Sequence, residues 1–345
     1  MQVATGLIGF GLAGSVLHAP LIAADPRLRL VAVASSRPDA VQPRCPHARV
    51  VADPYALIAD ADIDLVVIAT PNALHAPLAR AALTAGKHVV VDKPMVGDPA
   101  DAAPLIRLAA ERGRMLSVFH NRRWDGDFLT VERLVRQGTL GDLRLAALSW
   151  DRFRPAIKAG WREAPGEGAG LFADLGPHLV DQALRLFGLP DALTGDLAIQ
   201  RPSAQVDDYC AVTLHYGATR VLLSASTLVA APRPRFALHG SLGSFVKHGI
   251  DPQEATLRAG GTPDDPDFGQ DDAGAFGWLT LDGAPARPVP TERGDWRRFY
   301  AGVAAAILDG APVPVDPADA ATGLGLIALA RQSAAEGRTL PCRDL

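Results

Sequence analysis

The first third of the chain alternates short runs of apolar, often β-branched residues with longer stretches rich in alanine and leucine. The apolar runs predict buried strands over residues 3–8, 29–34, 64–69, 88–91 and 115–119. The stretches between them predict helices over residues 12–24, 54–59, 74–85 and 99–112. This alternation is typical of parallel strands joined by crossover helices, so we expect a doubly wound α/β domain over residues 1–120.

The pattern changes after Asn121, and residues 121–345 predict a second, α+β domain. Alternating polar and apolar positions on either side of Gly217, at 209–216 and 219–226, indicate an antiparallel hairpin. Further strands are expected at 143–150, 235–239, 244–247 and 254–258, and helices at 127–136, 296–308 and 317–336. Residues 260–277, rich in Gly, Pro and Asp, predict a surface loop, and the C-terminal helix could pack back on the first domain.

Composition and charge narrow the class of protein. The chain has 345 residues, of which 48% are hydrophobic and 21% charged, as in an ordinary globular protein of two domains. Its 34 basic and 38 acidic residues are mixed along the chain, so we expect neither nucleic acid nor a membrane as a partner. Three widely spaced cysteines argue against a disulfide framework or zinc ribbon. With no basic and apolar leader after Met1, we expect a cytoplasmic protein.

A glycine-rich turn separates the first strand from the first helix, and it reads Gly9-Phe10-Gly11-Leu12-Ala13-Gly14. In a dinucleotide-binding fold the first glycine permits a tight turn, the second lets the pyrophosphate approach the backbone, and the third allows close helix packing. The start of the following helix attracts the phosphates. The motif in this strand–turn–helix context predicts a bound dinucleotide.

The residues after the second strand bear on which dinucleotide binds. An NAD site would place Asp or Glu there to bind both ribose hydroxyls, whereas this chain has Ser35-Ser36-Arg37. Two hydroxyls and a guanidinium suit a 2′-phosphate, which an acidic side chain would repel. We therefore predict NADP, with NAD as the alternative if Arg37 is only a solvated loop residue.

Polar residues also follow the later strands of the first domain. They are Thr70-Pro71-Asn72, Asp92-Lys93-Pro94 and His120-Asn121-Arg122-Arg123. Ligands of open α/β sheets bind beyond the carboxyl ends of strands, so these residues indicate one crevice. Lys93 follows a buried run and could bond a substrate hydroxyl beside a nicotinamide. The alternative is a surface lysine paired with Asp92.

In the second domain a glycine-rich segment leads into a helical stretch containing Asp174 and His178. If one helix covers the stretch, these side chains share a face, with Asp181 one turn further on. Pro177 could instead begin the helix and leave Asp174 as its N-cap. The pair is either catalytic or solvated. The other histidines are assigned structural roles, and no HExxH spacing predicts a metal.

Four segments in this order resemble the Gfo/Idh/MocA oxidoreductase family. They are the glycine-rich turn, Thr70-Pro71-Asn72-Ala73-Leu74-His75, the run from Ala85 to Pro94, and the run from Asp174 to Asp181. The resemblance implies a Rossmann domain and a C-terminal domain with a large, mostly antiparallel open sheet on which a homodimer or homotetramer is built. It also implies NAD(P)-dependent oxidation or reduction of sugars, inositols or related polyols.

The resemblance also assigns roles to residues. Lys93 matches the family's Glu-Lys-Pro lysine, here preceded by Asp92, and would stabilise alkoxide charge. His178 would move the hydroxyl proton, and Asp174 would orient the imidazole or bind a neighbouring hydroxyl. The implied cofactor contacts include Thr70, Pro71, Asn72, His75, Asp92, Lys93, Asn121, Trp161 and Arg162. The family also contains NAD-dependent glycosidases without net redox and a non-enzymatic nucleotide-binding regulator, which remain alternatives.

Overall fold

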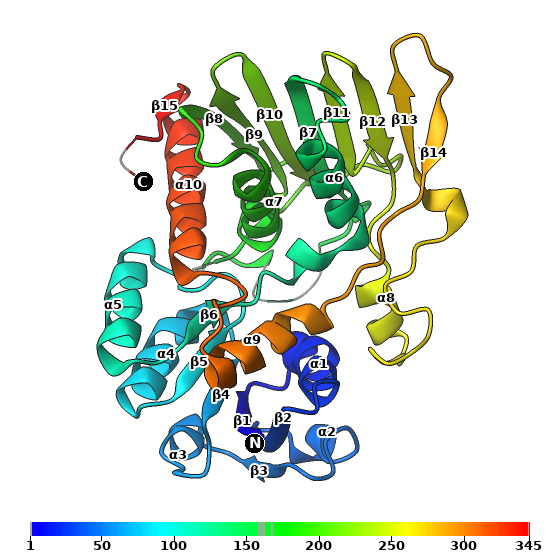
Figure 1. The fold of residues 1–345 in the computed structure, drawn as a ribbon. Coiled ribbons are helices and arrows are strands. Elements are labelled where there is room, and N and C mark those ends of the chain that lie inside the picture. The colour runs from blue at the N-terminus through cyan, green and yellow to red at the C-terminus, as the bar shows by residue number, and fades with distance from the viewer. Residues whose placement is uncertain (1, 158–159, 161–162, 167, 344) are drawn as a thin grey trace. The chain divides into compact units, whose positions relative to one another are not determined.

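The computed structural model describes residues 2–157, 160, 163–166, 168–343 and 345, and its contacts divide the chain into two compact units (Figure 1). The first unit comprises the residues up to Trp124 together with Pro252–Phe268 and Asp295–Ala321. The second comprises Asp125–Asp251, Gly269–Gly294 and the residues from Thr322 onward. Two segments from late in the sequence are therefore part of the first unit.

The first unit is built on a six-stranded parallel sheet in the order β3-β2-β1-β4-β5-β6. Its strands are β1 (Val3–Ile8), β2 (Leu28–Ala34), β3 (Arg49–Val51), β4 (Leu65–Ile68), β5 (His88–Val91) and β6 (Leu116–Val118). The central strands are buried on both faces, which explains why they are continuous apolar runs. The predicted doubly wound fold is confirmed. The three-residue edge strand β3 was not predicted.

Helices connect these strands and cover the sheet. They are η1 (Ala13–His18), α1 (Ala19–Ala23), α2 (Pro38–Val41), α3 (Pro54–Ile58), η2 (Asn72–Leu74), α4 (His75–Thr84), η3 (Pro99–Asp101), α5 (Ala102–Arg112) and η4 (Asn121–Trp124). The late segments add α8 (Gln253–Arg258) and α9 (Arg297–Asp309). The strand predicted at 254–258 is wrong, because this segment is helical and its Glu254 and Arg258 pair one turn apart at 2.7 Å.

An aromatic cluster joins α9 to the sheet of the first unit. The Phe119 ring, just after β6, lies 5.0 Å from the Phe299 ring and 4.2 Å from the His18 ring, measured between centroids. Phe299 and Tyr300 of α9 are fully buried. The burial of these rings accounts for the attachment of α9 to a sheet formed much earlier in the chain.

The second unit is built on a nine-stranded sheet in the order β14-β13-β12-β11-β7-β10-β9-β8-β15. Its strands are β7 (Leu143–Asp151), β8 (Ala192–Ala198), β9 (Tyr209–Tyr216), β10 (Thr219–Ser226), β11 (Phe236–Gly240), β12 (Gly243–Lys247), β13 (Gly277–Leu281), β14 (Arg287–Val289) and β15 (Leu340–Pro341). Among the strands that the structure describes in this sheet, only β7 and β10 pair in parallel. The large, mostly antiparallel sheet and the hairpin around Gly217 are confirmed.

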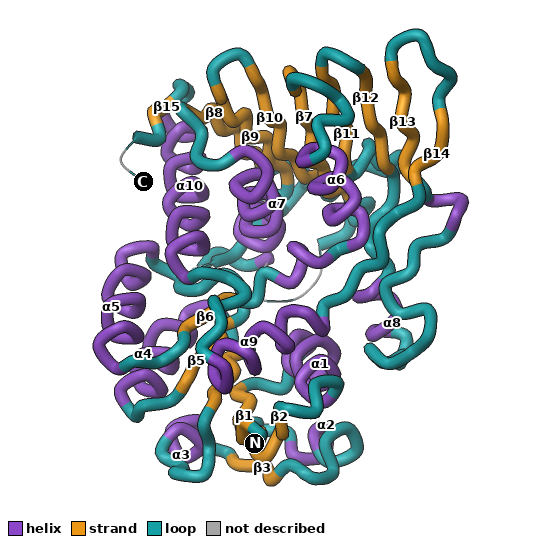
Figure 2. Tube along the Cα trace, in the orientation of Figure 1, coloured by secondary structure: helices purple, strands orange, loops and turns teal. Residues whose placement is uncertain are grey.

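The helices of the second unit lie on one face of this sheet, as Figure 2 shows for α6 (Gly126–Arg136), α7 (Leu171–Phe187) and α10 (Pro317–Glu336). Strand β8 was not predicted, because glycine, aspartate and two alanines leave Thr194 as its one β-branched residue. Its Gly195 permits the close approach of α10, since a Cβ there would lie 2.2 Å from the Ala330 carbonyl oxygen. Packing against α10 therefore outweighs weak strand propensity.

A buried ion cluster stabilises the loop after β7. The Arg201 guanidinium pairs with Asp208 at 2.9 Å and with Glu163 at 2.6 Å, and the Arg201 and Asp208 side chains are almost fully buried. Burial raises the pKa of Asp208, but hydrogen bonds from the Gln200 backbone and from Arg201 outweigh it and hold that pKa below its usual value. The ionised carboxylate is thus the form that stabilises this part of the fold.

Among the described residues, none of the helices is both long and apolar enough to cross a bilayer.

Candidate functional site

The glycine-rich turn has the geometry that a dinucleotide requires. Gly9 has φ +95°, and a Cβ there would lie 2.4 Å from the Ala69 carbonyl oxygen. A Cβ on Gly14 would lie 2.1 Å from the Gly9 carbonyl oxygen, whereas one on Gly11 would meet nothing within 4 Å. The first and third glycines are therefore needed for the turn and its packing. The second leaves open backbone, which fits an approaching pyrophosphate.

The turn lies where the strand order of the sheet reverses. From β1 the chain proceeds to β2 and β3 on one side and to β4, β5 and β6 on the other. Ligands of open α/β sheets bind at this switch point, outside the carboxyl ends of the strands. The predicted contact residues after β1, β2, β4, β5 and β6 all follow strand ends on this edge of the sheet.

Arg37 lies beside the same turn. Its Nη2 donates a hydrogen bond of 2.9 Å to the Phe10 carbonyl oxygen, and its backbone N–H donates to Ser35 Oγ at 3.1 Å. Ser36 and Arg37 are exposed. The guanidinium thus extends from the end of β2 to the glycine-rich turn, a position that fits a 2′-phosphate on the adenosine ribose.

His75 connects the loops that follow β4 and β5. The ring is buried, with Nδ1 2.7 Å from the Pro94 carbonyl oxygen and Nε2 2.9 Å from the Thr70 carbonyl oxygen. The Lys93–Pro94 peptide bond is cis. His75 was predicted as a cofactor contact, and these bonds show how it holds the Thr70 and Pro94 backbones in place.

Lys93 is half-buried directly after β5, and its backbone N–H donates a 2.7 Å hydrogen bond to Asp92 Oδ1. Burial raises the pKa of the Asp92 carboxyl, but its interaction with His18 and the charge of Lys93 outweigh burial and leave that pKa below its ordinary value. Asp92 therefore carries a negative charge that fixes the backbone next to Lys93.

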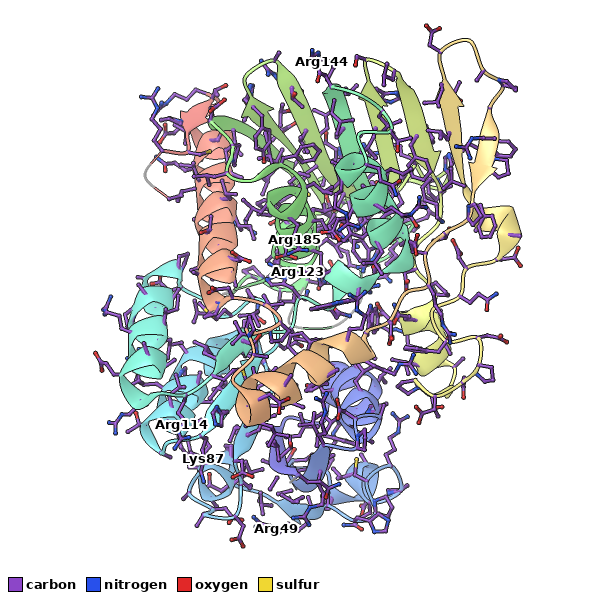
Figure 3. The ribbon with its side chains drawn as sticks, viewed as in Figure 1. Arg49, Lys87, Arg114, Arg123, Arg144 and Arg185 are labelled. Atoms are coloured by element: carbon purple, nitrogen blue, oxygen red, sulfur yellow. The ribbon has the colours of Figure 1, made fainter. Side chains whose placement is uncertain are left out.

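Asn121, Arg122 and Arg123, which lie in η4 shortly after β6, are buried. The Arg122 guanidinium pairs with Glu254 of α8 and lies 4.8 Å above the Trp296 ring, and the Arg123 guanidinium pairs with Asp319 at 3.1 Å (Figure 3 labels Arg123). These contacts attach the late segments to the first unit. The predicted contact residue Asn121 is 4% exposed.

In the second unit, Asp174 and His178 lie on one continuous helix, α7, with Pro177 inside it. The alternative with Asp174 as N-cap is wrong, because Gly170 caps the helix and the Asp207 carboxylate accepts from the Phe172 N–H at 2.6 Å. Gly170 has φ +95°, and a Cβ there would lie 2.4 Å from Asp207 Oδ1. The glycine thus admits the carboxylate that satisfies the helix start.

Two side chains that sequence patterns did not indicate contact the Asp174 and His178 pair, and a third contacts one of these two. The Trp150 ring, on β7, stacks on the buried His178 ring with centroids 5.6 Å apart. The buried Arg235 guanidinium lies 4.9 Å from the Trp150 ring. Arg152 Nη1 lies 3.4 Å from Asp174 Oδ2. Because these contacts join residues more than twenty positions apart in the sequence, no local pattern could reveal them.

Trp161 and Arg162 lie outside the described residues. A cavity of about 450 Å³ lies at the opposite, amino end of the parallel sheet, where Lys87 and Arg114 are labelled in Figure 3. The Lys87 ammonium there donates to the Asp60 and Ile63 carbonyl oxygens, at 2.6 and 2.7 Å. This lysine is used to join backbone segments.

Comparison with known proteins gives the same fold over the whole chain. Residues 3–120 match the NAD-binding Rossmann fold of the Gfo/Idh/MocA oxidoreductase family, and residues 132–342 match its C-terminal alpha/beta domain. The chain is 44% identical to the uncharacterized oxidoreductase YdgJ of Escherichia coli, with 98% of each chain covered. It is 38% identical to the scyllo-inositol 2-dehydrogenase (NADP(+)) IolW of Bacillus subtilis, covering 98% of this chain and 95% of that one.

A solved structure extends the likeness to three dimensions. The oxidoreductase yvaA of Bacillus subtilis superimposes with a TM-score of 0.95 at 38% identity, covering 99% of this chain and 98% of that one. The predicted family and fold class are confirmed. The protein therefore belongs to the Gfo/Idh/MocA family. It is an oxidoreductase that acts on CH–OH groups, and it has an NAD-binding Rossmann domain.

Proposed function

We propose that the protein is an NADP-dependent dehydrogenase or reductase of a sugar, inositol or related polyol. The observation that carries this proposal is the Arg37 guanidinium bonded to the carbonyl of Phe10, within the glycine-rich turn and at the end of β2. A cation at this place favours the 2′-phosphate of NADP. Full-length likeness to the NADP-dependent scyllo-inositol dehydrogenase of Bacillus subtilis supports both the cofactor and the polyol class.

Three residues have roles in the proposed reaction. When bound, the nicotinamide supplies or accepts the hydride. His178 takes the hydroxyl proton during oxidation and returns it during reduction, and its stacking on Trp150 restricts the orientation of the imidazole. Lys93, held through its backbone by Asp92, stabilises the developing alkoxide charge. Asp174, one helical turn before His178, binds a neighbouring substrate hydroxyl or orients the His178 imidazole.

The test is a panel of polyols, aldoses and inositols assayed with NADP⁺ and NAD⁺ by the absorbance of the reduced nicotinamide. We expect turnover with at least one inositol or sugar and a higher kcat/KM for NADP⁺. Net reduction of the cofactor distinguishes a dehydrogenase from a glycosidase, which would keep its cofactor tightly bound and show no net redox. No turnover with any member of the panel would contradict the proposal.

We also propose that the protein forms a homodimer or homotetramer through the sheet of the second unit. None of the described helices of that unit lies on the sheet face opposite α7 (Figure 2). Leu145 and Trp278 alternate along their strands with the buried core residues Ala146 and Leu279, so their side chains lie on that opposite face, where they are 37% and 53% exposed. Apolar side chains exposed across a broad sheet favour association. Light scattering after size-exclusion chromatography tests this, with Trp278→Lys expected to shift the protein towards smaller species. A monomeric wild type would contradict it.

A further inference from the structure

A chain of polar contacts leads from the buried helix α9 to the backbone of Lys93. The Tyr300 hydroxyl lies 2.6 Å from His18 Nδ1, and His18 Nε2 lies 3.9 Å from Asp92 Oδ2. The other carboxylate oxygen, Oδ1, accepts the 2.7 Å hydrogen bond from the Lys93 N–H. Residues from three separate segments thus meet next to the backbone of Lys93.

In this series of polar contacts, His18 and Tyr300 have little freedom to reorient. His18 and Tyr300 are fully buried, and the Phe119 ring packs against both, with centroids 4.2 Å and 6.0 Å away. If the Tyr300 hydroxyl donates to Nδ1, the neutral imidazole carries its proton on Nε2, the nitrogen that faces Asp92. In that tautomer the Nε2 proton is on the side of the Asp92 carboxylate, whose Oδ2 lies 3.9 Å away, beyond hydrogen-bond distance in this structure.

Packing alone does not account for these two side chains. A buried hydroxyl and imidazole are costly unless they bond to one another and to a further polar group, and a phenylalanine or leucine would fill the same space. His18 also ends η1, the helical segment that begins at the glycine-rich turn. It is therefore placed to connect the cofactor-binding turn with the residue before Lys93.

We propose that His18 and Tyr300 are positioning residues that orient the Asp92 carboxylate and, through it, the backbone from which Lys93 reaches the substrate. This inference rests on the proposed function, because it assumes that Lys93 acts on the substrate. It assigns to His18 a role different from the purely structural one expected from its sequence position. The two side chains touch neither substrate nor cofactor in this role.

Removal of one hydroxyl tests the proposal with the least disturbance. In Tyr300→Phe the ring remains and only the partner of His18 Nδ1 is lost. A displaced catalytic group is expected to lower kcat by about tenfold or more, while KM and the Kd for NADPH change less than about threefold. The matched control is Tyr216→Phe, which removes a hydroxyl that donates to the Gly188 carbonyl oxygen at 2.9 Å in the second unit. It should keep wild-type kcat.

A double variant separates this inference from the proposed function. Once Lys93→Met has removed the ammonium, adding Tyr300→Phe should cause no further loss of kcat, because the network acts only through Lys93. If Lys93→Met alone keeps full turnover, the proposed role of Lys93 fails. If Lys93→Met is impaired but Tyr300→Phe is normal, or if the two losses multiply, the positioning role is overturned.

Substitution of His18 gives a second route if Tyr300→Phe does not fold. His18→Gln keeps an amide that can donate towards Asp92, whereas His18→Leu keeps volume and loses every polar contact. The glutamine variant should retain at least about fivefold more kcat than the leucine variant at similar thermal stability. Equal kcat in the two variants would overturn the inference, because packing alone would then explain the position.

Discussion

Replacement of Arg37 by alanine should change the choice between NADPH and NADH. A charge-assisted contact of the guanidinium with the 2′-phosphate contributes about 1.5–3 kcal/mol. Because Arg37 is exposed, solvent and salt screen the contact, so we expect the lower end of this range, about tenfold in affinity. The hydrogen bond to the Phe10 carbonyl oxygen is lost for both cofactors and cancels in the ratio of their Kd values.

The assay is a titration of wild-type and Arg37→Ala protein with NADPH and NADH, followed by nicotinamide fluorescence at two salt concentrations. Arg44→Ala is the matched control, since Arg44 is also exposed and its guanidinium donates to the Ser15 carbonyl oxygen at 3.3 Å. The NADPH preference should fall about tenfold in Arg37→Ala at low salt and less at high salt, and it should persist in Arg44→Ala. An unchanged Kd ratio in Arg37→Ala, or equal losses in both variants, would refute the reasoning.

Three further predictions concern chemistry and stability. Lys93→Met should lower kcat by about a hundredfold in steady-state assays, with NADPH Kd and thermal midpoint nearly unchanged; normal turnover would remove the lysine from the mechanism. His178→Asn should abolish most activity and remove the basic limb of the reductive pH–rate profile. Asp174→Asn should be milder, and the loss of activity in the double variant should be smaller than the product of the two single losses. Multiplying losses or a wild-type profile would assign the pair a structural role. Asp208→Asn should lower the free energy of unfolding by about 1–3 kcal/mol at pH 7. The depressed pKa of Asp208 means that this difference, measured by urea denaturation, should shrink as the pH falls below about 4, and a constant difference would contradict it.

Local sequence patterns predicted the elements whose residue types are determined by burial within the element itself. Strand β5 was predicted with its observed bounds because its four residues are a buried central strand. The β9–β10 hairpin was predicted because its alternation breaks at Gly217, which adopts φ +54°. The glycine-rich turn was predicted with the backbone roles of Gly9 and Gly14, since that pattern reflects backbone geometry within a few residues.

Features that depend on distant residues were not predicted. The segment 254–258 has no strong period, and its helix is stabilised in part by the Arg122–Glu254 ion pair across more than a hundred residues. The carboxylate that accepts from the first turn of α7 belongs to Asp207, so the sequence around Asp174 left the position of Asp174 in the helix open. The partner of His18 is Tyr300, 282 residues later. Tertiary contacts of this kind override local propensity, and a short stretch of sequence does not reveal them.

The late return of α9 to the first unit affects how the protein emerges from a ribosome. The parallel sheet is complete by Val118, yet the rings that cover Phe119 and His18 belong to residues 299 and 300. At roughly 5–20 residues per second, translation of the intervening chain takes about ten to forty seconds. During that interval the nascent sheet exposes an apolar surface that a chaperone could bind, and a fragment ending near residue 120 would retain that surface permanently.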